Sequence, residues 1–301
     1  MKVFRSLALF VFLSFCIQVI HSQSIPTIAP VRLTFTTIDV PGAGFTYVSG
    51  INAAGNMVGI YGISNNGSYG NGFLFSNGTF SYFDYPGAMV TYASGINDSG
   101  VIVGTTRAAD WIDHGFLYDG LAYTKFDMPG QPETAGLGIN NAGDIVGAAG
   151  DFSAQVQAFE MQKGHSKRID LPNHALFEEA VGINNLGDVA AIALDGIDRY
   201  GFVYRNSKFK TFNFPGTHAV TAVSAINDHG VVVGSYFVYG AGFYGFAYKN
   251  GKYVSFGFPG ATETYVTGIN TSGQMVGAYV LPDSTEHGFV TSPITDADFS
   301  Y

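Results

Sequence analysis

A short polar segment contains three side chains suited to ligand binding: Arg107, Trp111 and Asp113. Trp111 is the only tryptophan of the chain, and an indole among acidic residues suits stacking on a sugar ring or a peptide group. We therefore group the three residues as a predicted ligand-binding set. The alternative is that the indole folds back onto the rim of the protein as a local plug, because single exposed aromatic residues are common.

A second candidate segment is rich in aromatic residues and contains Tyr236, Phe237, Tyr239, Phe243 and Tyr244. These side chains could form an apolar patch of the size used for binding. Core packing at the shoulder of a repeat unit is the alternative. Tyr236 and Tyr239 are the predicted ligand-binding residues of this segment.

One position of the repeat is a threonine in five of the six repeats and a glutamate, Glu178, in the fourth. The five threonines are Thr46, Thr91, Thr134, Thr221 and Thr264. Such a ring of hydroxyls near several carboxylates could hold Ca²⁺, which takes six to eight oxygen ligands. Paired carboxylates such as Glu178 and Glu133 could also act as acid and base in glycoside cleavage. A solvated acidic rim is the third alternative, and no spacing specifies a catalytic residue. Ca²⁺ is the only cofactor considered, and Glu178 joins the ligand-binding candidates.

The histidines do not have the spacing of a metal site. His114 and His287 occupy the same position of a repeat, where other repeats have asparagine, glutamine or tyrosine. A position that accepts any polar ring or amide indicates a hydrogen bond at the start of a strand, whereas a metal site needs converging ligands. No metal ligand is predicted.

These candidates are embedded in six repeats of 43 to 45 residues. Each repeat has an Ile-Asn pair followed by a glycine three residues after the asparagine, and the six asparagines are Asn52, Asn97, Asn140, Asn184, Asn227 and Asn270. In Asn-x-x-Gly the glycine supplies a positive φ that closes a hairpin. Within the second repeat, strands are predicted at 90–96, 101–105, 115–118 and 123–127. Four short strands per repeat of this length predict the blades of a β-propeller.

The ends of the repeat array predict how the ring closes. The segment from about 33 to 40 reads as a fourth strand with no unit before it, and 288–291 reads as a third strand with no fourth strand after it. Because the two remnants add up to one unit, we predict that the N-terminal strand completes the last blade. The expected fold is an all-β, six-bladed β-propeller with four-stranded blades. An open linear array is the alternative.

The repeats resemble the bacterial extracellular repeat family of the HAF type, named after its His-Ala-Phe motif. The matching phrases are Gly-Ile-Asn-x-x-Gly-x-Val-Val-Gly, with isoleucine also in place of the first valine, and the His-Gly-Phe triplets at 114–116 and 287–289. The resemblance covers about 260 residues. It implies export and a repeated β fold, and it implies no defined activity. The chain departs from the motif at two positions: the middle residue is glycine in every repeat except the third, which has Ala158, and the histidine is replaced by Asn71, Gln157, Tyr200 and Tyr244 in four repeats.

The N-terminal sequence predicts export. Lys2 and Arg5 precede an apolar run from Leu7 to Ile20, which is typical of a signal peptide over residues 1–22. The domain prediction continues with a linker at 23–31, the propeller at 32–292 and a C-terminal tail at 293–301. The protein is therefore expected to be secreted, extracellular or periplasmic, with no membrane insertion after signal removal.

Composition limits the partners. The formal net charge is −9 and only 12% of residues are charged. An acidic protein with no basic stripe is not suited to bind nucleic acid. The sequence predicts a monomeric binding module for an extracellular carbohydrate or protein ligand. An extracellular carbohydrate-active hydrolase or lyase and a structural cell-surface protein are the alternatives.

Overall fold

The computed structural model describes residues 31, 33–62, 70–171, 177–195, 198–206, 208–212, 214–215 and 221–300. The predicted signal peptide at 1–22 and nearly all of the predicted linker at 23–31 lie outside these residues. The described chain is built from β-strands, apart from one short 3₁₀ helix near the C-terminus. The predicted all-β class is confirmed.

Among the described residues, the strands pair into six antiparallel groups of four, which we call units one to six. Units one to three contain β2 (Phe45–Ile51), β3 (Met57–Gly62), β4 (Asn71–Ser76), β5 (Thr79–Phe83); β6 (Val90–Ile96), β7 (Ile102–Arg107), β8 (Asp113–Tyr118), β9 (Tyr123–Phe126); and β10 (Glu133–Ile139), β11 (Ile145–Asp151), β12 (Gln155–Gln162), β13 (His165–Arg168). Units four to six contain β14 (Phe177–Ile183), β15 (Val189–Asp195), β16 (Asp198–Arg205), β17 (Lys208–Phe212); β18 (Thr221–Ile226), β19 (Val232–Val238), β20 (Gly242–Lys249), β21 (Lys252–Phe256); and β22 (Glu263–Ile269), β23 (Met275–Val280), β24 (Glu286–Thr291), β1 (Phe35–Ile38).

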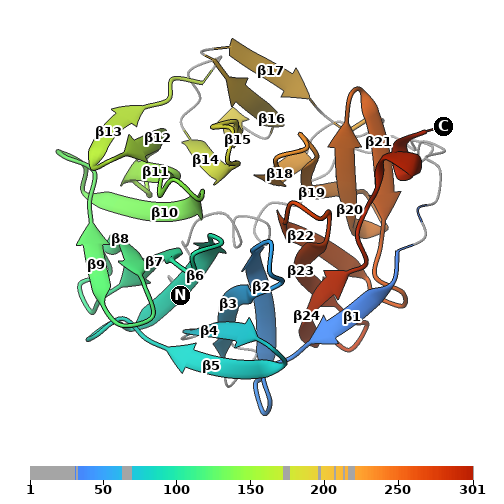
Figure 1. Cartoon of the computed structure of the whole chain (residues 1–301), viewed down its shortest axis with the longest axis horizontal. Coiled ribbons are helices and arrows are strands. Elements are labelled where there is room, and N and C mark those ends of the chain that lie inside the picture. The colour runs from blue at the N-terminus through green and yellow to red at the C-terminus, as the bar shows by residue number, and fades with distance from the viewer. Residues whose placement is uncertain are drawn as a thin grey trace.

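The units follow one another around a central axis, with the first strand of each unit innermost (Figure 1). Hydrogen-bonded pairing divides the strands into four sheets, two of eight strands and two of four. The larger sheets arise because single parallel pairs join neighbouring units, Val156 with Phe177 and Phe45 with Glu286. Each eight-stranded sheet therefore consists of two units whose strands are joined by one residue pair.

The repeated residues fill the space between the strands. The phenylalanine of each third strand is almost completely buried, at Phe73, Phe116, Phe159, Phe202, Phe246 and Phe289. In unit one the second strand places Gly59 under this ring, where an added Cβ would lie 1.9 Å from the carbonyl oxygen of Tyr47. The core of unit one therefore leaves no room for a side chain at this position, whereas unit four has Ala191 opposite its buried Phe202.

The turns have the predicted conformations. The glycine of every Asn-x-x-Gly hairpin has a positive φ, at Gly55, Gly100, Gly143, Gly187, Gly230 and Gly273. Its amide donates to the carbonyl of the asparagine three residues earlier, as from Gly55 to Asn52 at 3.0 Å. This single turn type fixes the register of the first two strands in each unit.

The N-terminal strand pairs with the last strand of the chain. β1 lies antiparallel to β24, with Phe35 opposite Thr291 and Ile38 opposite Gly288, so the predicted pairing is confirmed. His287 Nδ1 lies 2.8 Å from Asp39 Oδ2 across this junction, and His114 makes the same contact with Asp127 in unit two. The prediction of a hydrogen-bonding histidine position is confirmed for both histidines.

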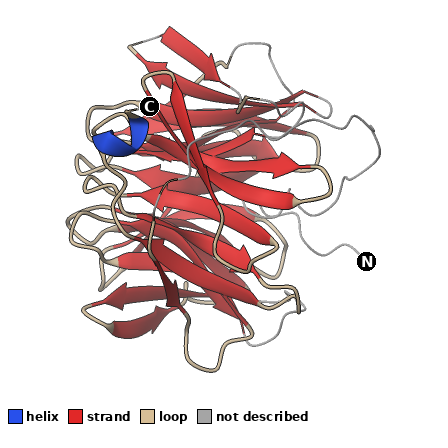
Figure 2. Ribbon diagram, turned by 90° about the vertical axis from the view of Figure 1, so that its right-hand side faces the viewer, coloured by secondary structure: helices blue, strands red, loops and turns tan. Residues whose placement is uncertain are grey.

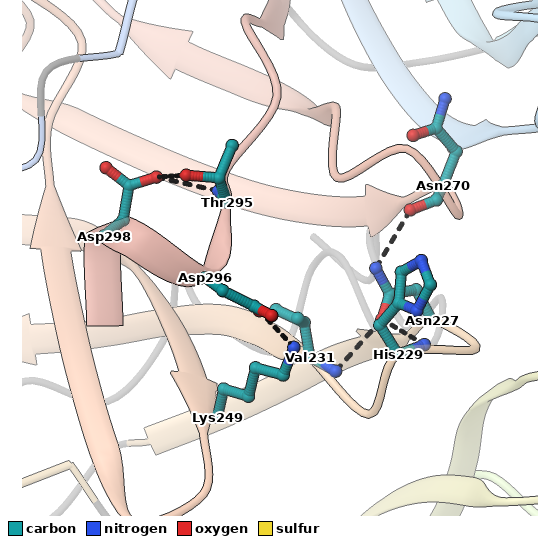
Figure 3. A network of polar contacts seen from close by, with 8 residues as sticks. All are labelled: Asn227, His229, Val231, Lys249, Asn270, Thr295, Asp296 and Asp298. Carbon is teal, nitrogen blue, oxygen red and sulfur yellow. Dashed lines mark hydrogen bonds and ion pairs between the residues drawn. The ribbon is translucent and has the colours of Figure 1, made fainter. Parts of the chain in front are cut away.

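The C-terminal segment is part of the fold, so the predicted tail at 293–301 is wrong as a separate tail. Helix η2 (Asp296–Phe299) lies at one face of the molecule (Figure 2). Phe299 is buried in a core cluster, and Asp296 forms an ion pair with Lys249 (Figure 3). The carboxylate of Asp298 accepts hydrogen bonds from the backbone amide and hydroxyl of Thr295, which stabilises the first turn. The buried phenylalanine anchors the segment.

Candidate functional site

One face of the molecule combines the segments between second and third strands with the starts of the first strands; we call it the loop face. Antiparallel connectivity places these segments at the same end of every unit. Residues 108–112 belong to the loop face, between the end of β7 at Arg107 and the start of β8 at Asp113. The predicted ligand-binding set therefore comes together in one hairpin.

Arg107 and Asp113 clamp the base of that hairpin. They are direct cross-strand partners, and the guanidinium donates twice, from Nε to Oδ1 and from Nη2 to Oδ2, both at 2.6 Å. Both side chains are buried, with Asp113 completely so. Burial raises the pKa of Asp113, and the two hydrogen bonds from Arg107 oppose that shift. Such bidentate pairs restrict geometry strongly, so Arg107 and Asp113 position the loop and are turned away from solvent.

Trp111 lies at the tip of the clamped loop and is 52% exposed. Its φ is +67°, a left-handed conformation that bulky residues adopt only when their surroundings enforce it. Its amide donates to the carbonyl of Ala108 at 3.0 Å, and the amide of Ile112 donates to Asp110 Oδ1 at 3.1 Å. The backbone on both sides of Trp111 is thus fixed, and the indole stands in solvent.

The aromatic segment of unit five is divided between core and surface. Tyr236 is buried, stacks on Phe214 with ring centroids 3.7 Å apart, and shares a hydrogen bond with Ser255. The core-packing alternative therefore holds for Tyr236, and its place in the ligand-binding set was wrong. Tyr239 is 64% exposed. Units two and five lie on opposite sides of the axis, so the structure does not bring Tyr239 and Trp111 together (Figure 1).

The predicted ring of threonines has a structural role. All five hydroxyls are buried and accept a backbone N–H from the residue that precedes the turn proline, as Thr46 does from Val40 at 3.0 Å. Glu178, at the same position in unit four, is completely buried and lies 3.8 Å from Arg168. Its place among solvent-facing ligand-binding residues was therefore wrong. In the described part of the chain, no group of three or more His, Cys, Asp or Glu residues is placed to hold a metal ion.

Sequence reasoning missed a cluster of tyrosines and carboxylates on the loop face between units five, six and one. The hydroxyl of Tyr47 donates to Glu286 Oε2 at 2.5 Å, and the hydroxyl of Tyr265 donates to Glu263. Burial raises the pKa of both tyrosines, and both glutamates raise it further. The four groups are therefore electrostatically coupled. The sequence signal for this cluster is the tyrosine directly after the repeated threonine, at Tyr47 and Tyr265. Tyr92 has the same position in unit two.

The innermost strands enclose a narrow channel. Each has a β-bulge, and the extra residues, Ser49, Ser94, Leu137, Val181, Ser224 and Thr267, line the passage. Two cavities of about 80 Å³ lie along it. Cavities of this size suit a few water molecules, whereas drug-sized ligands occupy about 300–1,000 Å³. The channel is therefore not the site for a sugar chain.

The hairpin end of the channel is encircled by a cycle of six hydrogen bonds. The Nδ2 of each repeated asparagine donates to the backbone carbonyl of the next one at 3.0–3.3 Å, and Asn270 completes the cycle by donating to Asn52. The side-chain oxygen of Asn52 also accepts the amides of Ala54 and Asn56 in its own turn. Each asparagine therefore stabilises its own turn and binds its unit to the next.

Comparison with known proteins defines the fold. No family profile and no curated protein matches the sequence. Among solved structures, the β-propeller domain of the Trilobed protease from Pyrococcus furiosus is 11% identical, with a TM-score of 0.51 over 86% of this chain and 98% of that one. A putative gluconolactonase is 10% identical, with a TM-score of 0.53 over 87% and 93%. The chain has a β-propeller fold.

Two further structures extend this similarity. A mutant of the Aleuria aurantia lectin, in complex with Fucα1-6GlcNAc, is 10% identical, with a TM-score of 0.51 over 85% of this chain and 93% of that one. TolB from Acinetobacter baumannii is 11% identical with a TM-score of 0.51, and the match covers 74% of this chain and 60% of TolB. In the described residues, no helix is long and apolar enough to cross a membrane.

Proposed function

We propose that the protein is a secreted, six-bladed β-propeller that binds an extracellular carbohydrate through its loop face. Units one to six are the blades, and β1 supplies the fourth strand of the last blade. The cyclic hydrogen bonds of the six asparagines and the pairing of β1 with β24 support this assignment. Since both act within one chain, we propose that the protein works as a monomer. The resemblance to HAF repeats supports export.

The observation that carries the proposal is the presentation of Trp111. An exposed indole on a mobile loop loses conformational entropy when it binds, and this loss weakens affinity. Here a buried bidentate ion pair and a left-handed conformation fix the backbone that carries the indole before any ligand arrives. An exposed aromatic ring on a fixed backbone suits the apolar face of a sugar ring, and its indole N–H can donate to a hydroxyl.

The test is a glycan-array screen of the purified protein with Ca²⁺ and again with a chelator, followed by titration of the best ligand. The Trp111→Ala variant should lose at least tenfold in affinity while its thermal unfolding stays unchanged. Tyr82→Ala is the matched control, because Tyr82 is 51% exposed but lies in β5, away from the 108–112 loop. Full affinity in Trp111→Ala, or an equal loss in the control, would contradict the assignment.

A carbohydrate-active hydrolase or lyase is the second candidate, favoured by the coupled carboxylates Glu263 and Glu286. Glycoside cleavage uses two such groups. The complete burial of Glu178 removes it from this role. Turnover of an oligosaccharide that is abolished in Glu286→Gln would favour the enzyme over the binding module. A protein that binds no glycan and assembles into surface layers would favour the structural alternative.

A further inference from the structure

The glutamates of the tyrosine–carboxylate cluster share one row of the sheet. Glu263 and Glu286 both pair with Val280, which lies on the strand between them, and Phe45 of unit one is the next residue in the row. Directly opposite residues point to the same face, so the carboxylates stand on one side with Cα atoms roughly 10 Å apart. Tyr265 and Tyr47 follow two residues after Glu263 and Phe45 and share their side.

Aromatic rings flank the two carboxylates. Tyr47 packs against Phe45 with ring centroids 5.6 Å apart, and Tyr265 packs against Phe243 at 5.0 Å. Tyr47 is buried, whereas Tyr265, Glu263 and Glu286 are partly exposed. The cluster thus offers negative charge and aromatic faces to solvent on the loop face. Both features attract organic cations.

Unit two shows what balances such a carboxylate elsewhere in the protein. Asp113 and Glu286 occupy the same position of the repeat, at the start of a third strand. The cross-strand partner of Asp113 is Arg107, whereas the cross-strand partner of Glu286 is Val280. Within the described residues, no Lys, Arg or His forms an ion pair with Glu263 or Glu286. Unit six therefore keeps the carboxylate position and omits the cation that unit two supplies.

We propose that Glu263, Glu286, Tyr47 and Tyr265 form a binding site for the ammonium group of an amino sugar. The ammonium takes the place that the Arg107 guanidinium has in unit two. The carboxylates accept its N–H donors and those of neighbouring sugar hydroxyls. The partly exposed ring of Tyr265 contacts the apolar face of the sugar. This inference rests on the proposed carbohydrate-binding function and adds a second contact on the loop face.

Calorimetric titration of the full-length chain tests the site with two matched probes, a glucosamine tetramer with free amines and its fully N-acetylated counterpart. The expected result is at least tenfold tighter binding of the free amine. Glu263→Gln and Glu286→Gln should each lower the affinity for the amine about tenfold and leave the acetylated probe unaffected. Glutamine keeps an oxygen to accept the tyrosine hydroxyl, so thermal unfolding should confirm an intact fold.

Glu133→Gln is the control, because Glu133 has the same position in unit three as Glu263 but already accepts the amide of Phe152 at 2.9 Å. It should bind the amine like the wild type. Equal binding of both probes that depends on Trp111 would overturn this inference and leave the proposed function intact. No binding of the amine, or unchanged binding in both glutamine variants, would also overturn it. Binding of an oligolysine peptide in preference to the amino sugar would overturn the sugar assignment.

Discussion

Replacement of Asn227 by alanine tests whether the asparagine cycle stabilises the whole ring. Asn227 is 4% exposed. It donates to the carbonyl of Asn270 at 3.1 Å, and its side-chain oxygen accepts the amides of His229 and Val231 at 3.1 and 3.0 Å (Figure 3). Alanine removes all three hydrogen bonds and adds no new ones.

Each hydrogen bond contributes about 1 kcal/mol net, so the expected loss is about 3 kcal/mol in the free energy of unfolding. For a domain of this size, each kcal/mol lowers the Tm by about 2–4 °C, which gives a fall of about 6–12 °C. Differential scanning calorimetry measures the Tm, and urea denaturation measures the free energy. His229→Ala is the control in the same turn, where an exposed side chain predicts a change within about 0.5 kcal/mol.

A double variant tests whether the bonds of the cycle act independently. The bond between Asn227 and Asn270 runs from the Asn227 side chain to the Asn270 backbone carbonyl, which alanine keeps, so Asn227→Ala and Asn270→Ala remove different bonds. The double variant should therefore be destabilised by about the sum of the two single variants. A Tm of Asn227→Ala within about 2 °C of the wild type, or a loss in the double variant well below that sum, would refute the reasoning.

Three further results are expected. Ile38→Ala, in the closing strand β1, should cost about 3 kcal/mol because Ile38 is buried, and a urea midpoint equal to the wild type would contradict closure by this strand. Gly59→Ala should unfold the protein or lower its Tm far more than Gly95→Ala. An added Cβ lies 1.9 Å from a backbone oxygen at Gly59, whereas it makes only ordinary contacts at Gly95. Similar Tm values for the two variants would contradict the packing argument. The hydrogen bond and charge of Lys249 lower the pKa of Asp296, so its contribution to stability is present above about pH 4 and is lost as the pH falls through the lowered pKa. The Tm difference between wild type and Asp296→Asn should therefore be present at pH 6 and vanish at strongly acidic pH, and a difference that grows on acidification would contradict this sign.

The strands and turns of the fold could be predicted because each depends on a few neighbouring residues. An Asn-x-x-Gly turn requires a positive φ at one glycine, and Gly100 has φ +82° as the pattern predicts. Pairing of β1 with β24 followed from counting complete units. The docking of η2 could not be predicted in this way, because it depends on burial of Phe299 against strands that are distant in the sequence.

The candidate site was harder to predict because spacing does not show which side chains face each other. Arg107 and Asp113 are six residues apart, and the length of the hairpin makes them direct cross-strand partners. As a result, the guanidinium of Arg107 donates its hydrogen bonds to the carboxylate of Asp113. The asparagine cycle had a readable signal. Aspartate could accept the same turn amides, but only asparagine can also donate, and all six repeats have asparagine.

The position at the start of the third strand shows where the repeats diverge in chemistry. In unit two it is Asp113, neutralised by Arg107; in unit five it is Phe243, packed on Tyr265; in unit six it is Glu286, which accepts from Tyr47. In each of these units the phenylalanine three residues later is buried. Asp113 and Phe243 are buried at this position, whereas Glu286 is partly exposed. The junction between units six and one, where this position reaches solvent on the loop face, is therefore the junction of the three that is best suited to bind a ligand.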